Sequence, residues 1–340
     1  MGRKFATSMI GLVVLGAFAA VADQGLGTGA DSYLDLTHQA RNAYETGDFD
    51  RAIALYNRVL IMEISPGAAS TAVMNRGIAY AAKQDWERAM RDCDEAITLN
   101  PRNADAYINR ATILAHNHEY EDAIKDLNEA LRMQPDQWQA YFNRAADYRD
   151  LGHVDLALAD LERVIKLNPK FPGAYVDRGA IRFSQGKTNQ ALADYRKAVE
   201  LDPRMVVAYE GEIVALLRKN QPSEAARLMN KILQISPDST EALNSIGWFL
   251  ATSPDTRARD GKNAIKAAEK ACQLSQWKNW AYIDTLAAAF AENGEFDQAV
   301  KYQERVMQTI PSQDKDIDGA KARLALYKQH KPYRQASPEG

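Results

Sequence analysis

The stretch "NRGIAYAAKQDWERAMRDCDEAITLNP", residues 75–101, is followed by three variants of itself. They are "NRATILAHNHEYEDAIKDLNEALRMQP" at 109–135, "NRAADYRDLGHVDLALADLERVIKLNP" at 143–169 and "DRGAIRFSQGKTNQALADYRKAVELDP" at 177–203. Successive copies begin 34 residues apart. A fixed period of this length is typical of an array of repeated structural units.

Each unit predicts two short helices. In the unit that begins at Ala104, a polar break, "HNHEY", separates two apolar stripes with helical spacing, and Pro135 ends the second helix because proline cannot continue one. The stripes comprise Ala106, Tyr107, Ala111 and Leu114, then Ala123, Leu127, Ala130 and Leu131. Small residues such as Ala111 and Ala123 stand where the two helices cross. One such pair cannot bury both of its faces, so the units must stack.

With these offsets the chain resembles the tetratricopeptide repeat (TPR) family. The second unit holds the family's small, aromatic and proline positions as Gly77, Tyr80, Trp86, Ala89, Ala96 and Pro101. The resemblance implies an all-α fold. It would be a right-handed superhelical solenoid of stacked antiparallel helix pairs, with about eight TPR units and a C-terminal capping helix.

The array accounts for most of the chain. Units are expected to begin near residues 33, 70, 104, 138, 172, 206, 240 and 280, so the array covers 33–311. A capping helix is expected at 312–330, because "GAKARLALYKQH" has the pattern of a helix with one apolar face. Residues 331–340 are expected to form a disordered tail.

The N-terminus differs from the array in composition. A basic start is followed by an uncharged run that ends in Ala20-Val21-Ala22, which indicates a signal peptide at 1–22. A Gly-rich linker would follow at 23–32. We expect an exported protein, periplasmic or secreted, with no membrane span after cleavage. The alternative is an uncleaved anchor in the inner membrane that faces the periplasm.

Composition and motifs argue against several classes of function. The formal net charge of −3 gives no electrostatic reason to expect nucleic acid as a partner. Cys93 and Cys272 are the only cysteines and are expected to be buried structural thiols. No catalytic, metal-ligating or cofactor-binding motif occurs, so we expect no enzyme, no metal and no cofactor. His118 replaces glycine in a turn, which indicates a positive φ there.

Two polar columns recur with the repeat. In the first, an arginine precedes an aspartate by 16 residues in four units: Arg76 and Asp92, Arg110 and Asp126, Arg144 and Asp160, Arg178 and Asp194. Folding an antiparallel pair brings the two positions together. The same spacing brings each aspartate near the arginine of the next unit, and the sequence does not separate these alternatives. We expect ion pairs that fix the stacking register.

The second column comprises Asn75, Asn109, Asn143 and Asp177. By the resemblance, this position in the first helix lines the concave face of the solenoid. A carboxamide offers a donor and an acceptor to a peptide backbone, so these residues are candidate peptide ligands. The adjacent positions are apolar and would form the floor of the groove: Met74, Ile108, Phe142 and Val176. The alternatives are solvated asparagines and apolar residues packed against a neighbouring helix.

The leading functional expectation is a non-catalytic scaffold for protein–protein interaction. It would bind a peptide segment or a helix of a partner in the concave groove. The alternative is an accessory subunit of an envelope enzyme or assembly complex, with the activity in the partner. No motif indicates the oligomeric state.

Overall fold

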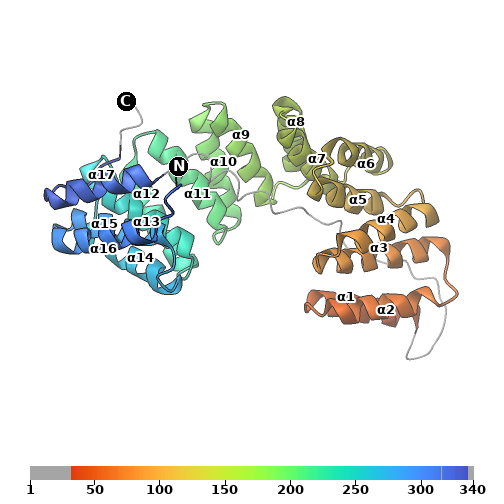
Figure 1. The fold of residues 1–340 in the computed structure, drawn as a ribbon. Helices are drawn as coiled ribbons and strands as arrows, with labels where there is room; N and C mark the ends of the chain where they lie inside the picture. The colour runs from red at the N-terminus through yellow and green to blue at the C-terminus, as the bar shows by residue number, and fades with distance from the viewer. Residues whose placement is uncertain (1–31, 315, 336–340) are drawn as a thin grey trace. The chain divides into compact units, whose positions relative to one another are not determined.

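A computed structural model describes residues 32–314 and 316–335. Within these ranges the chain forms seventeen α-helices, one short 3-10 helix and no strand (Figure 1). The expected all-α class is therefore confirmed. No helix in the described ranges has the length and apolar character to cross a membrane. The expected signal peptide at 1–22 lies outside the described residues, as does all of the linker except Ser32.

The chain divides into an N-terminal part that ends at Arg178 and a C-terminal part that begins at Gly179. The N-terminal part contains α1 Tyr33–Glu45, α2 Phe49–Leu60, α3 Pro66–Ala82, α4 Trp86–Leu99, α5 Ala104–His116, α6 Tyr120–Met133, α7 Trp138–Asp150 and α8 Val154–Leu167. Helix α9, Pro172–Ser184, crosses the division. The C-terminal part contains α10 Thr188–Leu201, α11 Val206–Arg218, α12 Pro222–Ile235, α13 Thr240–Thr252, α14 Gly261–Leu274, α15 Trp280–Glu292, α16 Phe296–Thr309 and α17 Ile317–Lys328.

Consecutive helices pack in pairs, and the pairs stack. In the N-terminal part α1 packs on α2, α3 on α4, α5 on α6 and α7 on α8. The second helix of each pair also contacts the first helix of the next, and first helices contact each other across α3, α5 and α7. The same alternation runs from α10 to α17 in the C-terminal part. Each part is thus a stack of antiparallel helix pairs, as the 34-residue period predicts.

Small residues let the two helices of a pair approach closely. A Cβ added to Gly77 of α3 would lie 3.0 Å from the Asp92 Cβ and 3.3 Å from the carbonyl oxygen of Ala89, both on α4. Ala89 itself is fully buried, as is Ala123 at the same place one repeat later. A larger side chain at these crossings would separate the helices and open the core.

In every pair except α13 and α14, the turn has a left-handed backbone conformation at one residue. Positive φ values recur every 34 residues, at Gln84, His118, Gly152, Gly186 and Asn220. The expectation for His118 is confirmed, with φ of 65°. The same turn geometry therefore forms with or without glycine. Residues that carry a Cβ adopt a positive φ at a cost in free energy.

We predict that Gly152→Ala lowers the free energy of unfolding by about 1 kcal/mol, because alanine is disfavoured at positive φ. A Cβ at Gly152 would meet no atom within 4 Å, so backbone strain is the only expected cause. His118→Gly at the equivalent turn is the matched control and should not destabilise the protein. Urea midpoints measured by circular dichroism provide the comparison. Equal midpoints for Gly152→Ala and the wild type would contradict the prediction.

The last helix closes the array. Helix α17 lies within the expected capping segment 312–330 and buries Ala320, Arg323 and Tyr327. The expected disordered tail at 331–340 differs from the structure over residues 331–335, which pack against the C-terminal part. The rings of Tyr333 and Trp248 lie 5.8 Å apart. Tyr333 and Arg334 make the contacts that hold this segment. Residues 336–340 lie outside the described range.

Candidate binding face

One face of the first helices carries the predicted peptide ligands. We define the first-helix stripe as the residues two, six, nine and thirteen places into each first helix, which fall on one side because their spacing is four, three and four. Helix α3 begins four residues early in its repeat, at Pro66, so its places are counted from Ser70. On α5 and α7 the stripe comprises Asp105, Asn109, Thr112, His116, Gln139, Asn143, Ala146 and Asp150. The predicted column of Asn75, Asn109, Asn143 and Asp177 lies at the second of these places.

The middle of the stripe is buried. Asn75 and Asn109 are each 1% exposed and Asn143 is 6% exposed. Helices α5 and α7 touch here, and the Asn143 Nδ2 donates to the Thr112 Oγ1 at 3.4 Å. The structure therefore places the carboxamides between neighbouring first helices, and not on the open surface that the sequence pattern implied. Their contact with a peptide stays a prediction.

The expected apolar floor belongs to the core at the four positions named for it. Met74 and Ile108 are fully buried, while Val176 and Phe142 are 2% and 5% exposed. The Phe142 ring lies 4.9 Å from the ring of Phe171, edge to face. These side chains pack against neighbouring helices, which is the alternative that the sequence leaves open.

The ends of the stripe are accessible. His116 and Asp150, at its last place on α5 and α7, are exposed, and His116 stacks on Trp86 with ring centroids 4.0 Å apart. Asp105 and Gln139, at its first place, are half-buried. A partner that lies along this face would therefore meet polar side chains at both ends of each helix.

A charged cluster surrounds the end of α7. The Arg149 Nε donates to the Asp150 Oδ1 at 3.0 Å, and the Arg149 Nη1 lies 3.8 Å from the Asp177 Oδ2. Burial raises the pKa of Asp177 to about 6, although Arg149 opposes the shift. Asp177, the last member of the predicted column, thus lies beside a guanidinium, while the three asparagines lie between helices.

Asp147, which lies next to the stripe on α7, is the residue that sequence reasoning missed. It is 3% exposed, and its Oδ2 has no hydrogen-bond partner among the described residues. Burial, together with the charge of Asp150, raises the pKa of Asp147 to about 8. The repeat does contain a signal for this residue. The residues 34 places before and after Asp147 are Ile113 and Ile181, which are both apolar. An acid at a place otherwise held by apolar residues indicates a buried carboxyl group.

We predict that Asp147→Asn stabilises the protein at pH 8 and has little effect at pH 4. The folded state of the wild type holds a proton that the unfolded state releases near pH 4, so stability falls as pH rises from about 4 to 8. Removing the carboxyl should raise the free energy of unfolding at pH 8 by about 1.4 kcal/mol or more, the equivalent of one pKa unit. Urea titrations of the variant and the wild type at pH 4 and pH 8 measure this difference in the free energy of unfolding.

The control for this prediction is Glu63→Gln, which changes an exposed acid in the loop after α2. It should leave the pH dependence of stability unchanged. If Asp147→Asn retained the wild-type slope between pH 4 and 8, the Asp147 carboxyl would be ionised in the folded protein, contrary to the prediction.

The arginine column forms forked ion pairs within helix pairs. The Nε and Nη2 atoms of Arg110 donate to the two Asp126 carboxylate oxygens at 2.7 and 2.8 Å. The same two-point contact joins Arg76 to Asp92 and Arg144 to Asp160. Arg76, Arg110 and Arg144 therefore each pair with the aspartate of their own unit, which is one of the two alternatives that the sequence leaves open. Arg178 and Asp194 fall in different parts of the chain, and Asp194 pairs with Arg182 at 2.7 Å.

The remaining guanidinium nitrogen reaches the preceding helix pair. The Arg110 Nη1 donates to Asp94 of α4 at 2.8 Å. At the equivalent places, the Nη1 of Arg76 donates to Asn57 of α2, and the Nη1 of Arg144 donates to Asn128 of α6. Each arginine thus joins both helices of its own pair to the pair before it.

This contact continues with reversed charge in the C-terminal part. Glu212 of α11 holds the place that arginine holds in earlier first helices. Arg196 of α10 holds the place of Asp94 and Asn128, and its Nε donates to the Glu212 Oε1 at 2.8 Å. The attraction between successive pairs is kept, although each charge has moved to the opposite helix.

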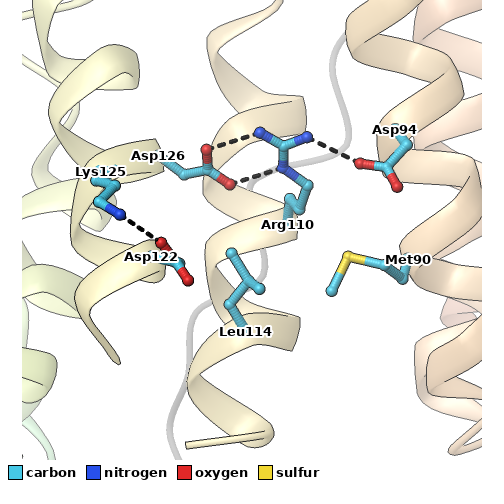
Figure 2. Close-up of a pocket in the computed structure, with 7 residues that line it drawn as sticks. All are labelled: Met90, Asp94, Arg110, Leu114, Asp122, Lys125 and Asp126. Carbon is cyan, nitrogen blue, oxygen red and sulfur yellow. Dashed lines mark hydrogen bonds and ion pairs between the residues drawn. The ribbon is translucent and has the colours of Figure 1, made fainter. Parts of the chain in front are cut away.

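Figure 2 shows the pocket around Arg110, whose guanidinium lies between Asp126 and Asp94. The pocket has a volume of about 360 Å³ and is lined by Met90, Asp94, Arg110, Leu114, Asp122, Lys125 and Asp126. Three carboxylates face two cations, and the Lys125 Nζ donates to Asp122 at 2.6 Å. Because the arginine is already paired on both sides, the pocket does not favour an anionic ligand.

We predict that Asp126→Ala lowers the free energy of unfolding by about 3 kcal/mol, because it leaves the partly buried Arg110 without its two-point partner. Glu129→Gln on the same helix is the control. It removes an exposed ion pair with Arg132 and should change stability by less than about 1 kcal/mol. Equal effects of the two substitutions on the urea midpoint would contradict this role of the arginine column.

Comparison with known families accounts for the repeat. Four tetratricopeptide repeat family models match the chain, at residues 38–104, 76–146, 138–171 and 172–205. The chain belongs to the tetratricopeptide repeat family. The TPR boundaries at 138 and 172 coincide with the first residues of α7 and α9. No curated protein sequence matches the chain.

Solved structures that resemble the chain come from different sources. Yeast Tom70 is 19% identical and has a TM-score of 0.58, with 95% of this chain and 69% of that chain covered. The C-terminal part of a TPR protein from Cytophaga hutchinsonii is 16% identical and has a TM-score of 0.53, with coverages of 74% and 99%. MamA is 22% identical, with a TM-score of 0.44 and coverages of 48% and 96%. These similarities concern the fold.

The TPR fold supports a protein-interaction scaffold, and it implies protein partners. TPR proteins are generally non-catalytic. In the described ranges no three His, Cys, Asp or Glu side chains are arranged to hold a metal ion. Both cysteines are free and buried, as expected, and burial raises the pKa of the Cys272 thiol to about 12.

Proposed function

We propose that the protein is a non-catalytic scaffold that binds an extended segment of a partner protein along the first-helix stripe of α3, α5 and α7. The stripe combines two features that such a segment needs. Its middle is a closely packed row of helices that holds a fixed shape, and its ends present accessible polar side chains. Backbone groups of an extended segment can then bond to carboxamides and carboxylates whatever the segment's side chains are.

Unsatisfied polar atoms along this face carry the proposal. The Gln139 Oε1 of the stripe and the Asp147 Oδ2 beside the stripe on α7 are buried and lack a hydrogen-bond partner among the described residues. Buried polar atoms in folded proteins are nearly always bonded, so two such atoms on α7 call for a partner. A segment whose amides reach Gln139, after a change of side-chain rotamer, would supply one.

The charges of the face favour a basic segment. Asp105 and Asp150 contribute two carboxylates, Asp177 of the next first helix, α9, adds a third beside Arg149, and Arg149 contributes one guanidinium. Arg149 is already engaged by two of these acids. The surplus of negative charge would attract lysine or arginine in the bound segment and would repel an acidic one.

We predict that Gln139→Ala combined with Asp150→Ala weakens binding of basic peptides at least tenfold. Peptides selected from a random display library against the wild-type chain serve as ligands, and fluorescence anisotropy measures their affinity. Glu63→Gln is the control and should bind as the wild type does. Unchanged affinity in a double variant with a wild-type circular dichroism spectrum would reject this face as the site.

Location and process are part of the same proposal. Residues 1–22 support export to the periplasm or beyond, where the scaffold would serve assembly of envelope proteins. N-terminal sequencing of the protein purified from the native cell tests this point. A chain that begins at Asp23 supports cleavage, whereas a chain that retains Met1 supports the anchored alternative.

A further inference from the structure

The end of α13 receives its hydrogen bonds from an unusual source. The last four carbonyl groups of a helix have no partner within it. Two of the last four carbonyl groups of α13 accept hydrogen bonds from residues that follow the helix. The Ser253 N donates to Phe249 O, and the Asp260 N donates to Leu250 O. The remaining two, of Ala251 and Thr252, accept from the C-terminal segment Tyr333–Gln335. The Gln335 N donates to Thr252 O at 2.9 Å, and the Arg334 Nη1 donates to Ala251 O at 3.4 Å.

The side chains of this segment are held as well. Tyr333 lies against Trp248 of α13, and the guanidinium carbon of Arg323 lies 5.4 Å from the Trp248 ring centroid and 5.5 Å from that of Tyr333. The Arg334 Nη2 lies 2.5 Å from the Glu292 Oε2 at the end of α15. The segment thus makes one aromatic contact, one cation–π contact, one ion pair and two hydrogen bonds to carbonyl groups of α13.

These contacts fall on the first-helix stripe of the C-terminal part. Trp248 and Thr252 are nine and thirteen places into α13, and Glu292 is thirteen places into α15. His116 and Asp150 hold that last place on α5 and α7. A non-helical segment of the chain therefore lies on the face that the TPR arrangement repeats in every first helix.

We propose that the ends of α13 and α15 form a second peptide-binding site, which takes a non-helical segment with an aromatic residue followed by arginine, and which Tyr333–Gln335 occupies reversibly. This site lies in the C-terminal part and does not depend on the site proposed on α3, α5 and α7. The chain's own C-terminus is the occupant, and a partner segment of the same chemistry gains access by displacing it.

The segment is attached more loosely than the helix that precedes it. Tyr327 and Arg323 of α17 are 0% and 8% exposed, and Arg323 is anchored to Asp284 at 2.8 Å. Tyr333, Arg334 and Gln335 are only half-buried and belong to no helix. Release of the segment would therefore leave α17 in place.

The site keeps its shape without the segment. The Arg259 Nε donates to the Glu292 Oε1 at 3.0 Å, which holds this carboxylate in position when Arg334 leaves. Glu292 then offers its second oxygen, and the exposed carbonyls at the negative end of α13 add attraction for a cation. Trp248 and Arg323 supply the surface for the aromatic ring. This chemistry selects an aromatic–arginine pair over an acidic or purely aliphatic segment.

The test compares the full chain with a full-length variant whose own segment is disabled by Tyr333→Ala and Arg334→Ala. The probe is a fluorescein-labelled peptide with the sequence of residues 331–340, and anisotropy measures its affinity. We expect the variant to bind the probe at least tenfold more tightly than the wild type, because the attached segment competes at an effective concentration of about millimolar. A probe with both alanine replacements should not bind.

A second substitution locates the site. Added to the variant, Glu292→Gln should weaken probe binding at least tenfold, while Glu295→Gln, an exposed acid just beyond α15, should not. Gln139→Ala with Asp150→Ala should also leave probe binding unchanged, which separates this site from the one proposed above. Equal affinity of the wild type and the variant, or no binding to either, would overturn the proposal and make the segment a fixed cap of α13.

Discussion

The forked contact of one arginine with three helices governs the stacking of the N-terminal part. Arg110 fixes α5 against α6 through Asp126 and fixes both against α4 through Asp94. A guanidinium can do this because it is planar and carries donors on three nitrogens, which a lysine lacks. Repetition of the contact at Arg76 and Arg144 sets one spacing for successive pairs. That spacing in turn decides which side chains of the first helices remain open.

Features that depend on neighbours along the chain were predictable from the sequence. The helix boundaries follow from the period, since seven of the eight expected starting positions coincide with the first residue of a helix, and only residue 70 falls inside one. The turn at His118 follows from its place in the repeat, because backbone conformation is a local property. The ion pairs of Arg110 and Asp126 were also visible as a column, although only the structure shows which helices they join.

Features that depend on the distance between stacked helices were not predictable. Asn109 was placed on the correct side of its helix, yet it is buried, because the contact between α5 and α7 closes over it. Periodicity gives the direction of a side chain but does not give the separation of two helices. The same limit applies to Tyr333 and Arg334, whose partners lie about 40 to 90 residues earlier and in no repeated pattern. Asp147 was missed because one atypical residue does not alter a period.

The reversed pair of Arg196 and Glu212 limits how the array can evolve. Repeat proteins gain and lose modules when recombination joins equivalent sites in different copies. In this chain the modules are not equivalent. A duplication that placed a second copy of α5 after α10 would set Arg196 against Arg110, and a deletion that joined α4 to α11 would set Asp94 against Glu212. Like charges at the junction would then replace an attraction with a repulsion, so the order of these modules is protected against shuffling.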